Sequence, residues 1–105
     1  MRDIDVHELK AMMDAKEDFQ LIDVREPYEY EIANLGGKLI PLGTILDHAD
    51  EISEDKKVVV HCRSGKRSET AILELERRFG FDNLYNLTGG ILAYSDKIDP
   101  SLPKY

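Results

Sequence analysis

The sequence contains a single cysteine, no tryptophan, and no apolar run near the roughly 18 residues that a membrane span needs. One cysteine cannot form an internal disulfide, and a free thiol suits a reducing compartment. The first residues also lack the apolar segment of a secretory signal peptide. We therefore expect a cytoplasmic protein, and neither a disulfide-stapled secreted domain nor an integral membrane protein.

Positive charge is also scarce, since 14 Lys and Arg stand against 21 Asp and Glu, for a formal net charge of −7. An acidic surface repels polyanions, which argues against nucleic-acid and anionic membrane partners. No His, Cys, Asp or Glu cluster has metal-site spacing, so neither a metal nor a cofactor is expected. The 105 residues, 42% of them hydrophobic, predict one domain over residues 1–105.

Predicted strands and helices alternate along the chain. A capping box at Asp5 and Glu8 begins the first helix. Further helices are predicted at 26–32, 44–52, from Gly65 to Gly80 and at 89–97, and strands at 19–24, 38–41, 57–61 and 84–87. The helix after Gly65 has one apolar stripe, formed by Ala71, Ile72, Leu75 and Phe79. The run Val58–Val60 is typical of a strand buried on both faces of a parallel sheet. We predict an α/β fold with a mainly parallel sheet, whose ligands bind at the carboxyl ends of the strands.

Cys62 falls at such a strand end, directly before a helix, and begins the cysteine loop (residues 62–68). Backbone N–H groups of a short turn can converge on an anion, and the helix dipole adds to their effect. These groups and three bases would lower the pKa of the thiol and hold a small anionic substrate. We predict Cys62 as a nucleophile or sulfur carrier, and the following six residues as its binding loop: Arg63, Ser64, Gly65, Lys66, Arg67 and Ser68.

Asp23 and Arg25 lie at the end of the strand predicted at 19–24 and should be near the same edge of the sheet as Cys62. We predict that they support the loop, with Arg25 pairing with Glu29 or Glu31. His61 precedes Cys62, so its side chain should point to the opposite face of the sheet. It is expected to be a packed imidazole rather than a general base.

The length of the cysteine loop separates two chemistries. A phosphate cradle of the tyrosine-phosphatase type places five residues between its cysteine and arginine. Here the sixth residue after Cys62 is Ser68, and Arg67 leaves only four between. The loop is one residue short for cradling a phosphate in that way. A more compact nest suits a sulfur atom carried on the thiolate.

Three segments together resemble a single-domain rhodanese, a sulfurtransferase: Leu21–Tyr30, Val59–Ser68 and Asn86–Ile91. The resemblance extends from about Ile4 to Tyr94. It implies a rhodanese-like α/β fold with a parallel five-stranded sheet flanked by helices on both faces. It also implies that Cys62 takes sulfane sulfur as a persulfide, from a donor such as thiosulfate, and passes it to cyanide or a thiol.

Some features are similar to a narrower group or depart from the family. Residues 34–41 and 98–103 look like rhodanese domains fused to adenylyltransferases that feed molybdopterin or thiamine synthesis. Tyr94 stands where the family usually has tryptophan. One alternative is therefore a sulfur-relay module that serves a sulfur-donor or sulfur-carrier protein in cofactor or tRNA sulfuration. Two further alternatives remain on this scaffold. One is a phosphatase or arsenate reductase, and the other is a non-catalytic binding domain.

Overall fold

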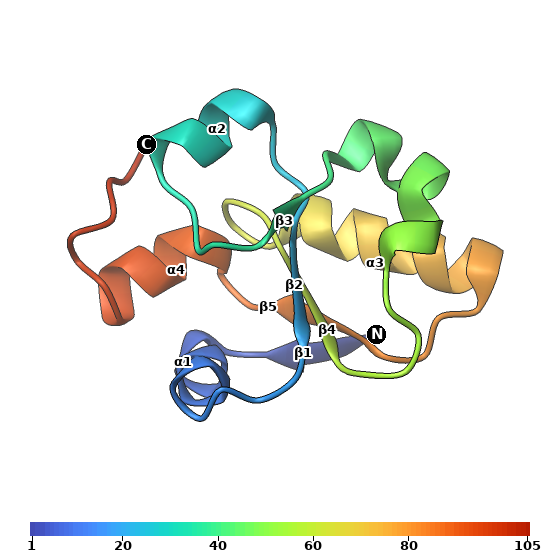
Figure 1. Ribbon diagram of the computed structural model, residues 1–105. Helices are drawn as coiled ribbons and strands as arrows, with labels where there is room; N and C mark the ends of the chain where they lie inside the picture. Colours follow the sequence, from blue (N-terminus) through green and yellow to red (C-terminus); the bar gives the residue numbers. More distant parts are fainter.

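The computed structural model describes residues 1–105, in which five strands and five helices alternate (Figure 1). The strands are β1 (Arg2–Ile4), β2 (Gln20–Asp23), β3 (Lys38–Leu39), β4 (Val58–His61) and β5 (Leu84–Leu87). The helices are α1 (Val6–Asp14), α2 (Pro27–Ile32), the 3-10 helix η1 (Leu42–Glu51), α3 (Lys66–Phe79) and α4 (Gly90–Lys97). The sheet order is β1-β5-β4-β2-β3, and every pairing is parallel. The predicted α/β fold is confirmed.

The central strand β4 is buried on both faces, as the valine run predicted. Val58 and Val60 belong to a core cluster shared with Ile72 and Leu75 of α3 and with residues of η1. Val59 belongs to a second cluster, whose other members include Leu9 of α1 and Tyr94 of α4. Helices therefore cover both faces of the sheet. In Figure 1, α2 lies instead over the edge at which the strands end.

Local signals explain where α1 and α3 begin and end. The Glu8 backbone N–H donates to Asp5 Oδ1 at 2.8 Å, and the Glu8 carboxylate accepts from the Asp5 backbone, which completes the predicted capping box. Gly65 begins α3 with a φ of +106° and Gly80 ends it with a φ of +72°, both in the left-handed region that favours glycine.

Three details differ from the sequence predictions. The strand β1 was missed, because three residues are too few to show a period of two. The helix predicted at 44–52 is a 3-10 helix from Leu42 to Glu51, with a kink at His48. Phe79 is 49% exposed rather than part of the buried stripe. Its ring packs edge-on against Phe81 at the surface end of α3, beyond the last buried turn.

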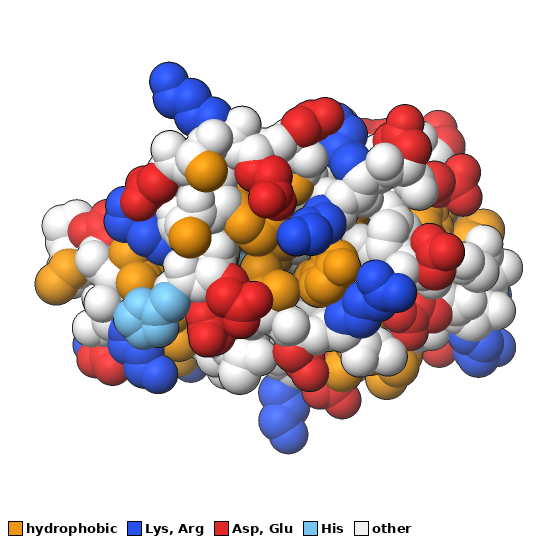
Figure 2. Space-filling view, turned by 90° about the horizontal axis from the view of Figure 1, so that it is seen from below, with side chains coloured by type: hydrophobic (Ala, Val, Ile, Leu, Met, Phe, Trp, Pro, Cys, Tyr) orange, Lys and Arg blue, Asp and Glu red, His pale blue; other side chains and the backbone are white.

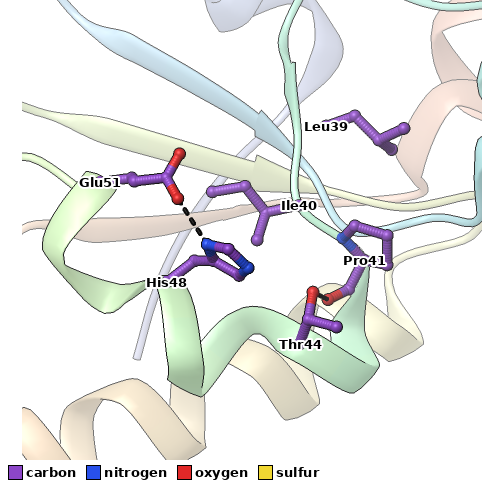
Figure 3. A pocket seen from close by; sticks show the side chains of 6 residues that line it. All are labelled: Leu39, Ile40, Pro41, Thr44, His48 and Glu51. Atoms are coloured by element: carbon purple, nitrogen blue, oxygen red, sulfur yellow. Dashed lines mark hydrogen bonds and ion pairs between the residues drawn. The ribbon is translucent and has the colours of Figure 1, made fainter.

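Two surface regions are formed by residues outside the cysteine loop. At the amino ends of the strands, basic and acidic side chains surround a small hydrophobic group, so neither sign forms a continuous field (Figure 2). Between β3 and η1 lies a hollow of about 110 Å³, where the His48 ring pairs with the Glu51 carboxylate beside Ile40 (Figure 3). Among the helices, none has both the length and the apolar character required to cross a bilayer.

Candidate functional site

Cys62 directly follows β4 at the carboxyl edge of the sheet, where the predicted nucleophile was expected to lie. Its side chain is 1% exposed and belongs to the core cluster between the sheet and α3. The next strands in the sheet end beside it, β2 at Asp23 and β5 at Leu87. The thiol is therefore surrounded by segments that are distant in sequence.

The sulfur atom receives its polar contacts from the cysteine loop itself. The Gly65 backbone N–H donates to Sγ of Cys62 at 3.1 Å, and the Ser68 hydroxyl oxygen lies 3.4 Å from the same sulfur. Burial raises the pKa of the thiol. The Ser68 hydroxyl and the backbone N–H groups of Ser68, Gly65 and Ser64 outweigh burial, so the pKa falls below its ordinary value. The loop can therefore hold an anionic sulfur.

Asn86 on β5 contacts the cysteine loop and is absent from the residues predicted for the site. The Ser68 hydroxyl lies within hydrogen-bond distance of both Oδ1 of Asn86 and Sγ of Cys62. Its one proton is donated to Asn86 while Cys62 is a neutral thiol and can turn to the sulfur when the thiol ionises. Nδ2 of Asn86 donates to the Gly65 carbonyl at 3.3 Å. Asn86 is 5% exposed, so these contacts satisfy a buried amide. The available signal was a polar residue inside a short apolar strand, just before Gly89-Gly90.

The start of α4 fixes the backbone of the cysteine loop. The N–H groups of Ile91 and Leu92 donate to the carbonyls of Cys62 and Arg63 at 3.0 and 3.1 Å. Gly90 makes this approach possible, because a Cβ atom there would lie 2.4 Å from the Arg63 carbonyl oxygen. The Gly90 φ of +60° is also in the left-handed region. The loop thus rests on α4 as well as on β4 and α3.

Two of the three predicted bases are held by other residues. Arg67 forms a two-point ion pair with Glu29 of α2, with N–O distances of 2.6 and 2.9 Å. The contact with Arg67 is the largest influence on the Glu29 carboxyl and, against the effect of burial, lowers its pKa from 4.5 to about 2. The Arg63 guanidinium lies 5.1 Å from the ring centre of Tyr105. Lys66 is exposed.

Asp23 and Arg25 form a fully buried pair at the same edge. The Arg25 guanidinium donates to both carboxylate oxygens of Asp23, with distances of 2.7 Å from Nη2 to Oδ2 and 2.9 Å from Nε to Oδ1. It also donates to the carbonyls of Ala33 and Glu29. The prediction that Arg25 pairs with a carboxylate of Glu29 or Glu31 is wrong, because Asp23 is two residues away on the same strand end.

His61 is buried, as predicted for a packed imidazole. Its Nε2 atom lies 3.7 Å from Oδ2 of Asp23 and has no hydrogen-bond partner. Burial lowers the pKa of the ring, while the Asp23 charge opposes that effect only in part. His61 is register partner to Asp23, so the two residues lie side by side on neighbouring strands.

A family model described as "Rhodanese-like domain" matches residues 5–97. The chain belongs to the rhodanese-like domain family. The similarity of the fold to solved structures supports this assignment. The crystal structure of a rhodanese-like domain protein from Staphylococcus aureus superposes on the chain with a TM-score of 0.82 at 31% identity. That match covers 92% of this chain and 94% of the other.

Two curated relatives are longer than this rhodanese-like domain. The Arabidopsis thaliana "Rhodanese-like/PpiC domain-containing protein 12, chloroplastic" is 44% identical over 113 residues, covering 100% of this chain and 38% of the relative. "Adenylyltransferase and sulfurtransferase UBA4" from Eremothecium gossypii is 37% identical over 98 residues, covering 83% of this chain and 22% of the relative. The chain thus spans well under half of either relative. Membership in the family supports sulfur transfer as the general class of chemistry.

Proposed function

We propose that the protein is a sulfurtransferase that carries sulfane sulfur as a persulfide on Cys62. The observation that carries the proposal is the convergence of the Gly65 N–H and the Ser68 hydroxyl on Sγ at the end of β4. These donors favour the thiolate, which is the nucleophilic form of cysteine. The same donors suit the negatively charged outer sulfur of a persulfide.

The reaction proceeds in two half-reactions. The Cys62 thiolate attacks the outer sulfur of a small anionic donor such as thiosulfate, and a new S–S bond forms. The donor's own S–S bond breaks, and sulfite leaves with the electron pair. An acceptor thiolate or cyanide then attacks the outer sulfur and releases the Cys62 thiolate. Each donor product leaves before the acceptor reacts, so ping-pong kinetics follow.

Intact mass after incubation with thiosulfate tests the proposal. Wild-type protein should gain the mass of one sulfur atom, and a thiol or cyanide should remove it. The Cys62→Ser variant should gain nothing, because its hydroxyl is not a comparable nucleophile. A wild-type protein that stays unmodified with both thiosulfate and a persulfide donor would overturn the proposal.

A second candidate is a relay module that receives its sulfur from a partner protein. The 1% exposure of Cys62 favours this candidate, because a sheltered persulfide is protected between donor and acceptor. The relative named as an adenylyltransferase and sulfurtransferase also joins two activities in one chain. Competition between thiosulfate and the persulfide of a cysteine desulfurase distinguishes the candidates. Faster loading by the desulfurase identifies the relay.

Phosphatase or arsenate reductase activity has less support. The Arg67 guanidinium, the only arginine near the position of a phosphate-binding arginine, is engaged by both oxygens of Glu29. An aryl phosphate should therefore remain intact with wild-type protein. Hydrolysis that is lost in Cys62→Ser would restore the phosphatase hypothesis. For the compartment, we propose the reducing cytoplasm, since the working group is a free thiol.

A further inference from the structure

Residues 98–105, which we call the tail, pass from the end of α4 to the rim of the cysteine loop. In Figure 1 the tail leaves α4 and ends beside α2. Its course is fixed by the Ser95 hydroxyl, which donates to the Leu102 carbonyl at 2.7 Å. An exposed ion pair between Lys104 and Asp96, at 3.2 Å, adds a second contact. Ile98 and Leu102 also pack against the second core cluster, so the first part of the tail is anchored to the body of the protein. Residues 103–105 have no regular secondary structure and take part in no backbone–backbone hydrogen bond.

The tail places Tyr105 among the charged groups at this rim. The Tyr105 hydroxyl accepts a hydrogen bond from Nη1 of Arg25 and donates to Oε2 of Glu29, which lies 2.9 Å away. The guanidinium carbons of Arg25 and Arg63 lie 5.7 and 5.1 Å from the ring centre. Cations within about 6 Å of an aromatic ring are attracted to it. Tyr105 therefore joins the buried support of the site to the residue that follows Cys62.

The backbone of the cysteine loop and the Arg67 side chain are held firmly by their neighbours. Hydrogen bonds from α4 hold the carbonyls of Cys62 and Arg63, and Glu29 holds Arg67 at two points. Cys62 is nevertheless 1% exposed, so a group must shift before a reagent reaches the sulfur. Residues 103–105 of the tail are held through side chains alone, because none of them forms a backbone–backbone hydrogen bond. Arg63 is a side chain of the cysteine loop that contacts the Tyr105 ring.

We propose that Tyr105 is a positioning residue of the Cys62 site and that the tail is a removable cover. The ring keeps the Arg63 side chain against the rim, and the hydroxyl braces the Glu29 carboxylate that holds Arg67. When Tyr105 leaves, Arg63 loses its ring partner and becomes available to an anionic donor. The inference rests on Cys62 being the reacting group, and it names the gate that controls access to it.

The alkylation rate of Cys62 by iodoacetamide tests the cover without requiring sulfur transfer. A cover slows a reagent by the factor by which it reduces the open population. Tyr105→Ala should therefore react at least several times faster than wild type. Tyr105→Phe keeps the ring but loses both hydroxyl contacts, so its rate should lie between those of wild type and Tyr105→Ala. The pH midpoint of the rate should be the same in all three proteins, because the cover controls access and not the acidity of the thiol.

Control variants distinguish an opening of the tail from a general loss of stability of the protein. Lys10→Ala removes an exposed ion pair within α1, which is not part of the tail, and should react like wild type. Thermal unfolding should show that each variant is folded, and Tyr105→Leu replaces Tyr105→Ala if the alanine variant is not. A wild-type alkylation rate in the folded variant without the aromatic ring would overturn the proposal. So would a faster rate that comes with a shifted pH midpoint, since Tyr105 would then act through the thiol pKa.

Discussion

The Arg67 guanidinium and the Glu29 carboxylate form a two-point ion pair that joins α3 to α2. Glu29 is 3% exposed, whereas the Arg67 side chain is 34% exposed, so the carboxylate is the sheltered partner. The pair balances one of the positive charges of the cysteine loop inside the protein. It also holds the first turn of α3, which includes Ser68 beside the sulfur.

The stability of this pair should depend on pH in a defined direction. The Glu29 pKa is lowered from 4.5 to about 2, so its contribution is complete above pH 4.5 and is lost as pH falls toward 2. The contribution corresponds to on the order of 3 kcal/mol. Glu29→Gln should therefore lose about 3 kcal/mol at pH 7, because it leaves Arg67 without a charged partner.

Urea unfolding at pH 7 and pH 3 measures both effects. The difference between wild type and Glu29→Gln should shrink at pH 3, where wild type has begun to lose the carboxylate's contribution. Glu31→Gln is the matched control, because Glu31 is exposed on the same helix. An equal loss in both variants would contradict a specific role for the pair.

Glycine at position 90 should be required for the loop to reach its place. A Cβ in Gly90→Ala would meet the Cys62 and Arg63 carbonyl oxygens at 2.5 and 2.4 Å, so backbone must shift. We expect a loss of about 3 kcal/mol in unfolding free energy and slower loading of Cys62. Gly43→Ala, whose Cβ would meet nothing within 4 Å, should stay within about 0.5 kcal/mol of wild type. Equal stability of the two variants would refute the close-approach argument.

The Ser68 hydroxyl should set part of the acidity of Cys62. In Ser68→Ala the thiol loses a hydrogen-bond donor, so its pKa should rise and alkylation at pH 7 should slow severalfold. Ser64→Ala should leave the pH midpoint unchanged, since Ser64 acts on the sulfur through its backbone N–H. The pH dependence of the iodoacetamide rate gives both midpoints. If Ser64→Ala shifted the midpoint as far as Ser68→Ala, the assigned donors would be incorrect.

His61 should make the protein less stable in mild acid. Burial lowers the pKa of His61 in the folded state. Below about pH 6.5 the ring therefore binds a proton in the unfolded chain but stays neutral in the folded protein. Stability should therefore fall as pH drops from 6.5 toward the folded-state pKa. In His61→Gln this slope should flatten, as seen by thermal unfolding at several pH values. His7→Gln, altered at an exposed position on α1, should keep the wild-type slope.

Much of the architecture could be predicted because its signals are local. The capping box at Asp5, the valine run and the glycines at 65 and 80 each state a backbone preference within a few residues. The strand β1 could not be found in this way. Its three residues become a strand only because β5, some 80 positions later, offers a partner.

The part of the site that lies within one short segment of the sequence could be predicted. The part that depends on contacts between distant segments could not. The cysteine loop could be located from its own residues. Asn86 and Tyr105 enter the site only through folding, from β5 and from the tail. The partner of Arg67 was hidden for the same reason, since Glu29 is 38 positions away in the sequence.

The polar contacts of the sulfur come from neutral dipoles in a closed loop, while Arg67 is matched to a carboxylate. Mobile ions screen exposed charges strongly, but they have little access to hydrogen bonds formed inside the protein. The acidity of Cys62 should consequently be almost indifferent to ionic strength. The alkylation rate of Cys62 at a fixed pH should then change little between dilute and concentrated salt.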